Sequence, residues 1–320
     1  MEHSDKSAAV RVVRYDELRP CFDAFIDTRT PGSDKKENFT IIGPGVSENP
    51  NQHVHIAEPH GFNIGGARQP PGCVNSQHSH DTAEFFYVHT GQWSFDLGET
   101  GEDASIVLNP GDAISIPTKV FRGFKNVGED TGFLFAALGG DDPGRVLWAP
   151  YVFDMAEEYG LVLLENGLLI DTKAGEEVAA DMQPMPATSR AQVEALQRFD
   201  DTALRRCCVM SDDDVACDSS NGVQRRKIVH PEGELNWPHE FSVEEVRLEA
   251  GASLDLGREA HNQVVFVQAG EVVVSANAEQ RIGLGDTATI TPGQPRKFHN
   301  PTDAAAIAVL VTACTPPKAH

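Results

Sequence analysis

Two histidines and a glutamate lie close together in the sequence, at His78, His80 and Glu84. Alternate residues of a β-strand point to the same face, so a strand here turns both imidazoles to one side. Glu84, four residues after His80, can join them once the chain has turned. Two imidazoles and a carboxylate are the ligand set of non-haem Fe(II) enzymes, and Mn, Ni, Zn or Cu also fit it. The spacing therefore predicts one divalent metal site with open positions for substrate or oxygen, although a lone His-x-His pair is more often structural.

The surrounding residues point to a family. Residues 72–91 read GCVNSQHSHDTAEFFYVHTG, and residues 111–126 read GDAISIPTKVFRGFKN. The first stretch resembles the first motif of the cupin superfamily at each defining position: Gly72, His78, His80, Glu84 and Gly91. The second resembles the second cupin motif, with these residues in place: Gly111, Pro117 and Asn126. The resemblance implies a double-stranded β-helix barrel that holds a metal ion.

One position departs from the cupin pattern. In metal-binding cupins the second motif usually ends with a histidine that supplies a fourth ligand, and here that position is Arg122. An arginine stays protonated and cannot ligate a metal. Two roles for Arg122 remain open. It can bind an acidic group of the substrate beside the metal by a bidentate contact, or it can pair with Glu84 in a metal-free barrel.

The sequence also repeats itself, which sets the domain organisation. Residues 59–62 (PHGF) resemble residues 238–241 (PHEF) at an offset of 179, and Gly111-Asp112 falls on Gly285-Asp286 at an offset of 174. The same two offsets relate further pairs: Arg68 and Arg247, Gly91 and Gly270, Arg122 and Arg296, and Asn126 and Asn300. We infer that the chain is a duplicated unit, and the cupin resemblance makes it a bicupin.

Each unit is expected to be all-β. Short runs rich in Phe, Val, Ile and Tyr, such as residues 84–89, are interrupted by Gly, Pro and Asp roughly every 8–12 residues, as in a sandwich or barrel. The predicted fold is two tandem jelly-roll (cupin) barrels with a partly helical linker. The expected parts are an N-terminal extension, a metal-binding barrel, the linker and a degenerate barrel: residues 1–48, 49–145, 146–228 and 229–315.

The segments outside the barrels have weaker patterns. Residues 189–208 have apolar side chains at the spacing of an amphipathic helix, and Ser189 is a candidate N-cap. A further helix or strand is expected near residues 15–25.

In the second unit the ligand positions are occupied by Gly257, Glu259 and Gln263, with Arg296 in place of histidine. No two imidazoles remain, so this barrel is expected to hold no transition metal. Glu259 and Arg296 could form a buried ion pair, which is costly unless it is well hydrogen-bonded.

Composition excludes several classes of function. The 320 residues have a formal net charge of −22, and such an acidic surface repels nucleic-acid phosphates. The N-terminus lacks the pattern of a secretory signal, and no apolar run approaches the roughly 20 residues of a membrane helix, so we expect a cytoplasmic protein. The six cysteines are scattered and are expected to be ordinary thiols: Cys21, Cys73, Cys207, Cys208, Cys217 and Cys314.

The cupin resemblance implies a metal-dependent oxidoreductase, and we expect a dioxygenase that uses one divalent ion, Fe(II) first. A small anionic substrate is expected, with Arg122 holding its acidic group. Gentisate-type ring-cleaving dioxygenases are similar bicupins, but their metal sites are all-histidine. A metal-assisted lyase, isomerase or decarboxylase is an alternative, and so is a bicupin that only binds a small ligand. Exposed strand edges also make a homodimer an expectation.

Overall fold

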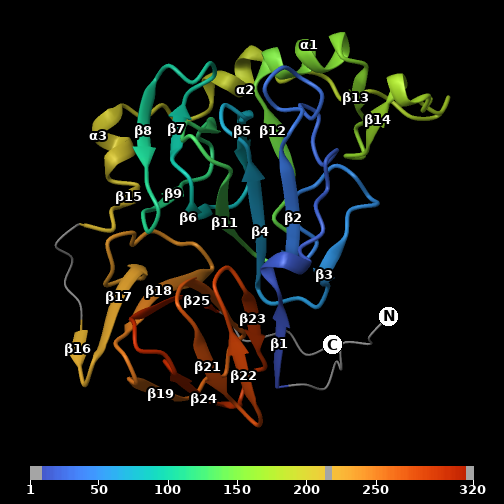
Figure 1. The fold of residues 1–320 in the computed structure, drawn as a ribbon. Helices are drawn as coiled ribbons and strands as arrows, with labels where there is room; N and C mark the ends of the chain where they lie inside the picture. Colours follow the sequence, from blue (N-terminus) through green and yellow to red (C-terminus); the bar gives the residue numbers. More distant parts are fainter. Residues whose placement is uncertain (1–8, 213–217, 315–320) are drawn as a thin grey trace.

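The computed structural model describes residues 9–212 and 218–314, which form two β-barrels (Figure 1). Each barrel consists of a large sheet and a smaller sheet with an apolar core between them. The predicted all-β fold of two tandem jelly-roll barrels is confirmed. Short helices and loops of the linker cover the end of the first barrel that lies away from the second barrel (Figure 1).

The first barrel contains a seven-stranded and a five-stranded sheet. The seven strands, in spatial order, are β15 (Cys208–Val209), β9 (Ala113–Ile116), β6 (Glu84–Thr90), β11 (Gly132–Gly139), β4 (Phe62–Gln69), β2 (Glu37–Ile42) and β3 (Val54–Ile56). The five strands are β12 (Val146–Trp148), β5 (Val74–His80), β10 (Arg122–Asn126), β7 (Trp93–Leu97) and β8 (Ala104–Leu108). Phe86, Phe95 and Phe124 pack between the sheets, because alternate residues of each strand face inward.

The second barrel repeats this arrangement. Its seven-stranded sheet contains β1 (Val10–Val13), β23 (Thr287–Ile290), β20 (Gln263–Ala269), β25 (Ala306–Ala313), β18 (Phe241–Leu248), β17 (Val223–Val229) and β16 (Asp218–Ser220). Its four-stranded sheet contains β19 (Ser253–Arg258), β24 (Pro295–His299), β21 (Val272–Ser275) and β22 (Glu279–Ile282). β6 and β20 are related by the offset of 179 found in the sequence, and β9 and β23 by the offset of 174. The inferred duplication is therefore visible in the fold.

The two large sheets pack against each other through a shared apolar core. Phe135 of the first barrel stacks on Phe266 of the second, with ring centroids 4.5 Å apart. Two reciprocal hydrogen bonds join the barrels: His60 Nε2 lies 2.6 Å from Thr289 Oγ1, and His239 Nε2 lies 2.5 Å from Ser115 Oγ. The duplicated units thus contact each other through equivalent residues.

The sheets cross the boundaries predicted from the sequence. β1, within the predicted extension, pairs antiparallel with β23 of the second barrel, whereas β2 pairs with β4 of the first. The predicted boundary after residue 228 falls inside β17. A strand at a sheet edge leaves N–H and C=O groups unpaired. The N-terminal segment supplies partners for such groups, through β1 on β23 and β2 on β4. Residues 1–8 lie outside the described residues, and the element near residues 15–25 is a 3-10 helix, η1 (Tyr15–Glu17).

The linker is only partly as predicted. Its elements are α1 (Pro150–Glu158), β13 (Leu161–Leu163), β14 (Leu169–Asp171), η2 (Thr172–Ala174), α2 (Arg190–Glu194) and α3 (Asp201–Arg205). Ser189 caps α2 in a capping box, as expected. The single helix predicted over residues 189–208 is wrong, because Gln197 N bonds to Lys119 O (2.7 Å) and Asp200 caps a new helix. No helix of the described residues is long and apolar enough to cross a membrane.

The shared core makes a prediction about stability. Replacing Phe266 by alanine should lower the free energy of unfolding by about 3–5 kcal/mol, since it opens a cavity between the two sheets. Leu284→Ala is the matched control: Leu284 is 59% exposed, and its loss should change the free energy by at most about 0.5 kcal/mol. Urea unfolding followed by circular dichroism measures both. Equal effects would contradict a core shared by the two barrels.

Candidate metal centre

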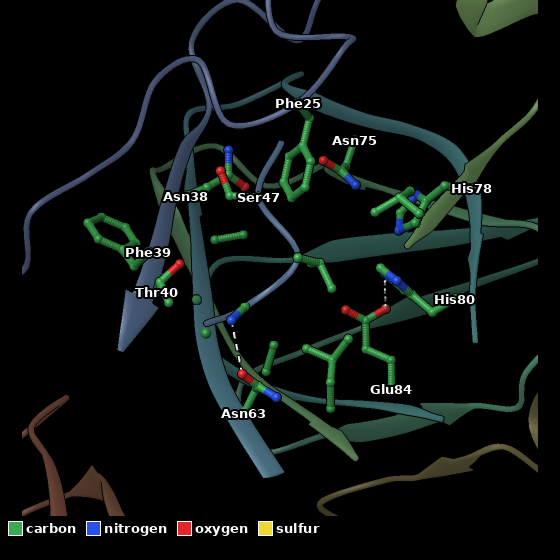
Figure 2. A pocket seen from close by; sticks show the side chains of 18 of the residues that line it. Phe25, Asn38, Phe39, Thr40, Ser47, Asn63, Asn75, His78, His80 and Glu84 are labelled. Atoms are coloured by element: carbon green, nitrogen blue, oxygen red, sulfur yellow. Dashed lines mark hydrogen bonds and ion pairs between the residues drawn. The ribbon is translucent and has the colours of Figure 1, made fainter. Parts of the chain in front are cut away.

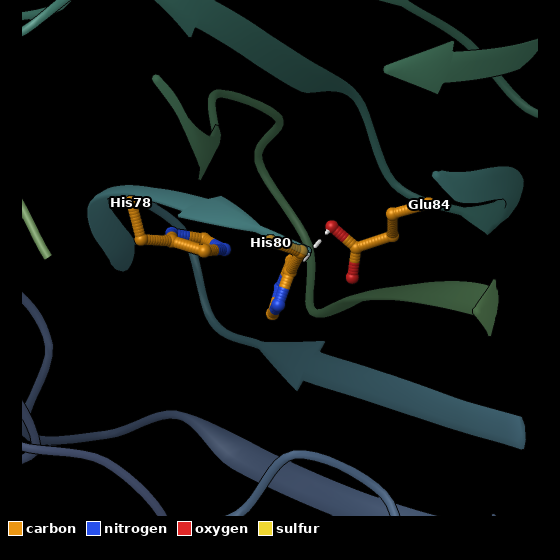
Figure 3. A group of neighbouring side chains, drawn as sticks. All are labelled: His78, His80 and Glu84. Carbon is orange, nitrogen blue, oxygen red and sulfur yellow. Dashed lines mark ion pairs between the residues drawn. The ribbon is translucent and has the colours of Figure 1, made fainter. Parts of the chain in front are cut away.

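The three predicted ligands meet at one point in the first barrel. His78 and His80 lie on β5, and Glu84 begins β6 after a short turn. All three side chains are buried, and their ligand atoms lie within 4.8 Å of one another (Figure 3). No other cluster of three metal-ligating side chains occurs in residues 9–212 and 218–314. The strand geometry inferred from the spacing therefore brings the trio together.

The ring of His78 is held in one tautomer. Its Nδ1 lies 2.7 Å from the carbonyl oxygen of Ser76. A carbonyl oxygen can only accept, so Nδ1 carries the proton and Nε2 keeps its lone pair for a metal. The ring also packs against Trp148, with centroids 5.2 Å apart. Both contacts restrict the direction in which His78 presents its ligand nitrogen.

His80 has no hydrogen-bond partner of its own. Its Nδ1 is buried and unpartnered within the described structure, and its Nε2 lies 3.6 Å from Glu84 Oε2, beyond a normal hydrogen bond. A buried polar group without a partner costs about 1–3 kcal/mol. A divalent ion bound by the trio would take one ring nitrogen of His80 as a ligand, so the donor set and a ring that makes no hydrogen bond fit a metal.

Burial and a nearby positive charge keep both imidazoles in the neutral form. Burial, followed by the charge of Arg122, holds the pKa of both His78 and His80 well below the ordinary value. Both rings are therefore neutral, which is the form that binds metal. Burial raises the pKa of Glu84, and the Arg122 guanidinium opposes that shift.

Arg122 faces the carboxylate rather than the open space. Its Nη2 lies 2.5 Å from Glu84 Oε2, and its Nη1 lies 3.4 Å from the carbonyl oxygen of His78. The side chain is completely buried and is not among the residues that line the cavity. Of the two roles left open by the sequence, pairing with Glu84 is the one that the structure contains.

A partly enclosed cavity lies beside the trio (Figure 2). The volume of this cavity, counted as the space open to the centre of a water molecule, is about 80 Å³. Most of the lining is apolar, and no lysine or arginine of the described residues is part of it. Apart from the three ligands, the polar side chains are Asn38, Thr40, Ser47, Gln52, Asn63 and Asn75. The cavity therefore suits a small molecule with an apolar body.

Asn75 is a cavity residue that sequence reasoning missed. Simple alternation along β5 places it on the opposite face from His78. However, in the pairing of β10 with β5, Arg122 is the partner of His78 and Phe124 is the partner of Asn75. Two residues along β10 therefore correspond to three along β5. This β-bulge adds one residue and turns Asn75 to the side of the ligands. No signal in the sequence marks the bulge.

The second barrel departs from one expectation. Arg296 bonds to Gln263 Oε1 (3.2 Å) and to the carbonyl oxygen of His261 (2.9 Å), while Glu259 is half-exposed and contacts the His261 ring. The possible Glu259–Arg296 ion pair is thus absent. The reason is that the register of β19 shifts at Gly257, where φ is +66°, and Glu259 follows the end of that strand. Gln263, the counterpart of Glu84, binds the arginine instead.

The cysteines take no part in the trio. Cys73, the cysteine nearest to it in sequence, is buried and is not one of the clustered ligands. Burial raises the pKa of the Cys207 thiol to about 12, so it is protonated. Cys217 lies outside the described residues.

Comparisons with known proteins bear on the fold. Residues 67–137 match the family model of the cupin domain. Oxalate decarboxylase from Bacillus subtilis is similar in structure, with a TM-score of 0.59 and 11% identity over 98% of this chain and 78% of that one. Oxalate decarboxylase from Lactobacillus farciminis, in a formate complex, has a TM-score of 0.60 and 12% identity over 99% and 89%. No curated protein sequence matches.

At these identities the structural likeness establishes the fold. Residues 67–137 are similar to the cupin domain, and the chain as a whole shares its two-barrel fold with the oxalate decarboxylases.

The ligand assignment predicts the effect of removing one imidazole. After equilibration with Mn(II) and desalting, wild-type protein should retain about one ion per chain, and His78→Ala should retain almost none, since two ligands hold an ion poorly. His53→Ala is the control, because His53 is exposed and lies outside the cavity. Elemental analysis measures the metal. An ion kept by His78→Ala would refute the assignment.

Proposed function

We propose that this bicupin is a metal-dependent lyase that removes a carboxyl group from a small substrate bound in the first barrel. The observation that carries the proposal is the buried trio, with neutral imidazoles and an unpartnered His80, on the wall of an apolar cavity. Likeness in fold to oxalate decarboxylases supports decarboxylation. The comparisons give no support to the dioxygenase expected from the sequence.

His78, His80 and Glu84 would hold the ion, and His78 would present Nε2 to it. When bound, the ion would act as a Lewis acid for charge on a substrate oxygen, with positions left open by a three-residue ligand set. The donor set accepts Mn(II), Fe(II), Ni(II), Zn(II) or Cu(II).

Charge balance supports an anionic substrate. The two imidazoles are neutral, and Arg122 already compensates Glu84. The positive charge of a divalent ion would therefore have no counter-charge from these four side chains. In a buried site such a charge favours an anionic ligand strongly. A substrate carboxylate meets this requirement without direct contact to Arg122.

The rest of the cavity narrows the substrate class. Phe86 and Phe124 offer an apolar surface, and no lysine or arginine of the described residues is available for a second carboxylate. The amide oxygen of Asn75 accepts from Lys36 Nζ (3.1 Å), so Nδ2, which has no partner in the described structure, can donate to a substrate. We therefore infer a monocarboxylate with an apolar body and one neutral oxygen acceptor, rather than a dicarboxylate.

The reaction class is tested with metal-loaded protein. Mn(II)- and Fe(II)-loaded samples are given a panel of 2-oxo, 3-oxo and hydroxy monocarboxylates, together with oxalate. We expect CO₂ release from a monocarboxylate without stoichiometric O₂ uptake, because the ion acts as a Lewis acid. An oxygen electrode and a CO₂ assay follow both gases. O₂ consumed in step with turnover would favour the dioxygenase, and metal-loaded protein without any turnover would favour a ligand-binding bicupin.

The assigned role of Asn75 is tested by Asn75→Asp. The aspartate keeps an acceptor for Lys36 but replaces the amide donor, so the variant should lose about 1–3 kcal/mol of transition-state binding for an oxygen-bearing acid. The readout is kcat/KM for that acid divided by kcat/KM for an analogue without the oxygen, because repulsion of the common carboxylate cancels in the ratio. An unchanged ratio would remove Asn75 from the substrate site.

A further inference from the structure

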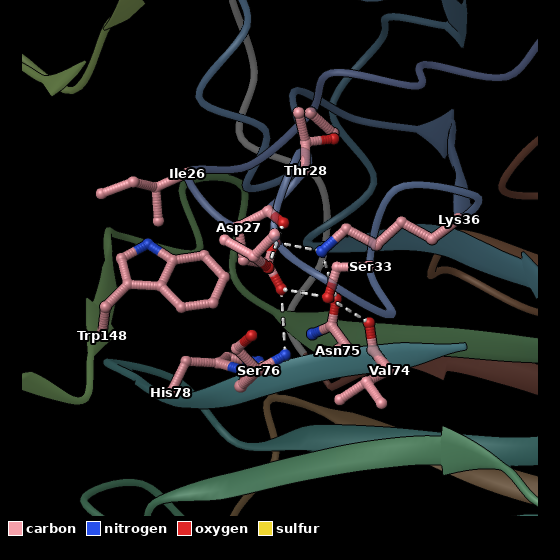
Figure 4. Close-up of polar contacts among 12 residues, drawn as sticks. Ile26, Asp27, Thr28, Ser33, Lys36, Val74, Asn75, Ser76, His78 and Trp148 are labelled. Atoms are coloured by element: carbon pink, nitrogen blue, oxygen red, sulfur yellow. Dashed lines mark hydrogen bonds and ion pairs between the residues drawn. The ribbon is translucent and has the colours of Figure 1, made fainter. Parts of the chain in front are cut away.

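A buried ion pair lies beside β5, next to the serine between Asn75 and the ligand strand's histidines (Figure 4). Lys36 Nζ bonds to Asp27 Oδ1, and both side chains are 0% exposed. Both residues belong to the segment that precedes the first barrel, and neither lines the cavity. A buried pair contributes little net stability, because its desolvation cost is comparable to its attraction. Its position therefore calls for a reason other than stability.

The carboxylate of Asp27 supports the bulge in β5. Its Oδ2 accepts from the backbone N–H of Ser76 at 3.0 Å and from Ser33 Oγ at 3.3 Å. Ser76 lies between the two paired positions Asn75 and His78, where β5 has its additional residue. A bulge leaves such a residue without a ladder partner. Asp27 supplies that partner from a segment 49 residues away.

The same serine connects Asp27 to a metal ligand. The carbonyl oxygen of Ser76 accepts from His78 Nδ1, the bond that fixes the ring tautomer. Asp27 thus holds the amide of Ser76 while His78 is held by its carbonyl. Lys36, the other member of the pair, bonds to the amide oxygen of Asn75 at 3.1 Å. Asp27 is thus connected to His78 through the backbone of Ser76, and Lys36 is bonded directly to Asn75.

We infer that Asp27 and Lys36 are positioning residues of the metal centre. Asp27 acts on the His78 ring through the backbone of Ser76, and Lys36 orients the Asn75 amide. This inference rests on the proposed metal site. Hydrogen bonds behind metal-ligating histidines commonly change metal affinity by about 10- to 100-fold, and that is the effect expected of Asp27.

Two double variants separate this role from a structural one, since both remove the two charges together. Asp27→Leu/Lys36→Met removes the acceptor for Ser76, and its Mn(II) dissociation constant should rise about 10- to 100-fold. Asp27→Asn/Lys36→Met retains an amide oxygen for Ser76, and its constant should stay within about threefold of wild type. Isothermal titration with Mn(II) alone measures both. Equal affinities in the two variants would overturn the inference.

A distant ion pair provides the control. Arg225 and Glu244 form a bidentate pair in the second barrel, with both N–O distances 2.7 Å. Arg225→Met/Glu244→Leu removes the same charges and should leave Mn(II) affinity unchanged. Wild-type protein that bound no Mn(II) would end both the proposed function and this inference. Wild-type binding with unaltered affinity in Asp27→Leu/Lys36→Met would end the inference alone.

Measurements on metal-free wild-type protein cover the case in which the leucine variant does not fold. Nitrogen-15 NMR should show His78 protonated at Nδ1, and hydrogen exchange should show the Ser76 amide as protected as amides paired within β5. A mixed His78 tautomer or a rapidly exchanging Ser76 amide would overturn the inference, because the two bonds at Ser76 are what transmit the position of Asp27.

Discussion

The buried contact between Arg122 and Glu84 sets the charge balance of the candidate metal centre in the first barrel. Both groups are withdrawn from water, and removing either partner would leave an uncompensated charge that costs about 3–5 kcal/mol. The pair occupies the arginine that stands where metal-binding cupins usually place a histidine. In the proposed metal centre, an arginine at this position leaves three protein ligands. Because the pair is already neutral, the charge of a bound ion would have to be matched by a substrate.

The second barrel shows what the same arginine does without a metal site. Arg296 also binds the residue at the position of Glu84, but that residue is the neutral Gln263. Among the described residues no cluster of three metal-ligating side chains lies there, and Arg296 bonds to the backbone of His261 as well. The arginine is thus compatible with the bare fold. What distinguishes the first barrel is a carboxylate with two neutral histidines beside it, which is the difference expected if one copy of a duplicated unit kept the metal.

The N-terminal segment ties these features together. Its strands enter the large sheets of both barrels, and Asp27 and Lys36 bond to Ser76 and Asn75 of β5. The strand with both histidines is therefore held at its bulge by a buried polar network. A bulge in an unsupported strand would slip easily, because shifting the register by one residue turns every side chain to the opposite face.

Residue order alone predicts two features, the duplicated β-fold and the grouping of His78, His80 and Glu84. Both depend on local order: the repeat is read directly from residue spacing, and two histidines at alternate positions share a strand face wherever the strand lies. Residue order also places Gly257, Glu259 and Gln263 at the corresponding positions of the second unit. Three features could be found only in the folded chain: the partner of Arg122, the inward direction of Asn75 and the place of Asp27 and Lys36. These depend on a bulge that breaks strand alternation and on contacts between residues far apart in the chain, neither of which a local pattern contains.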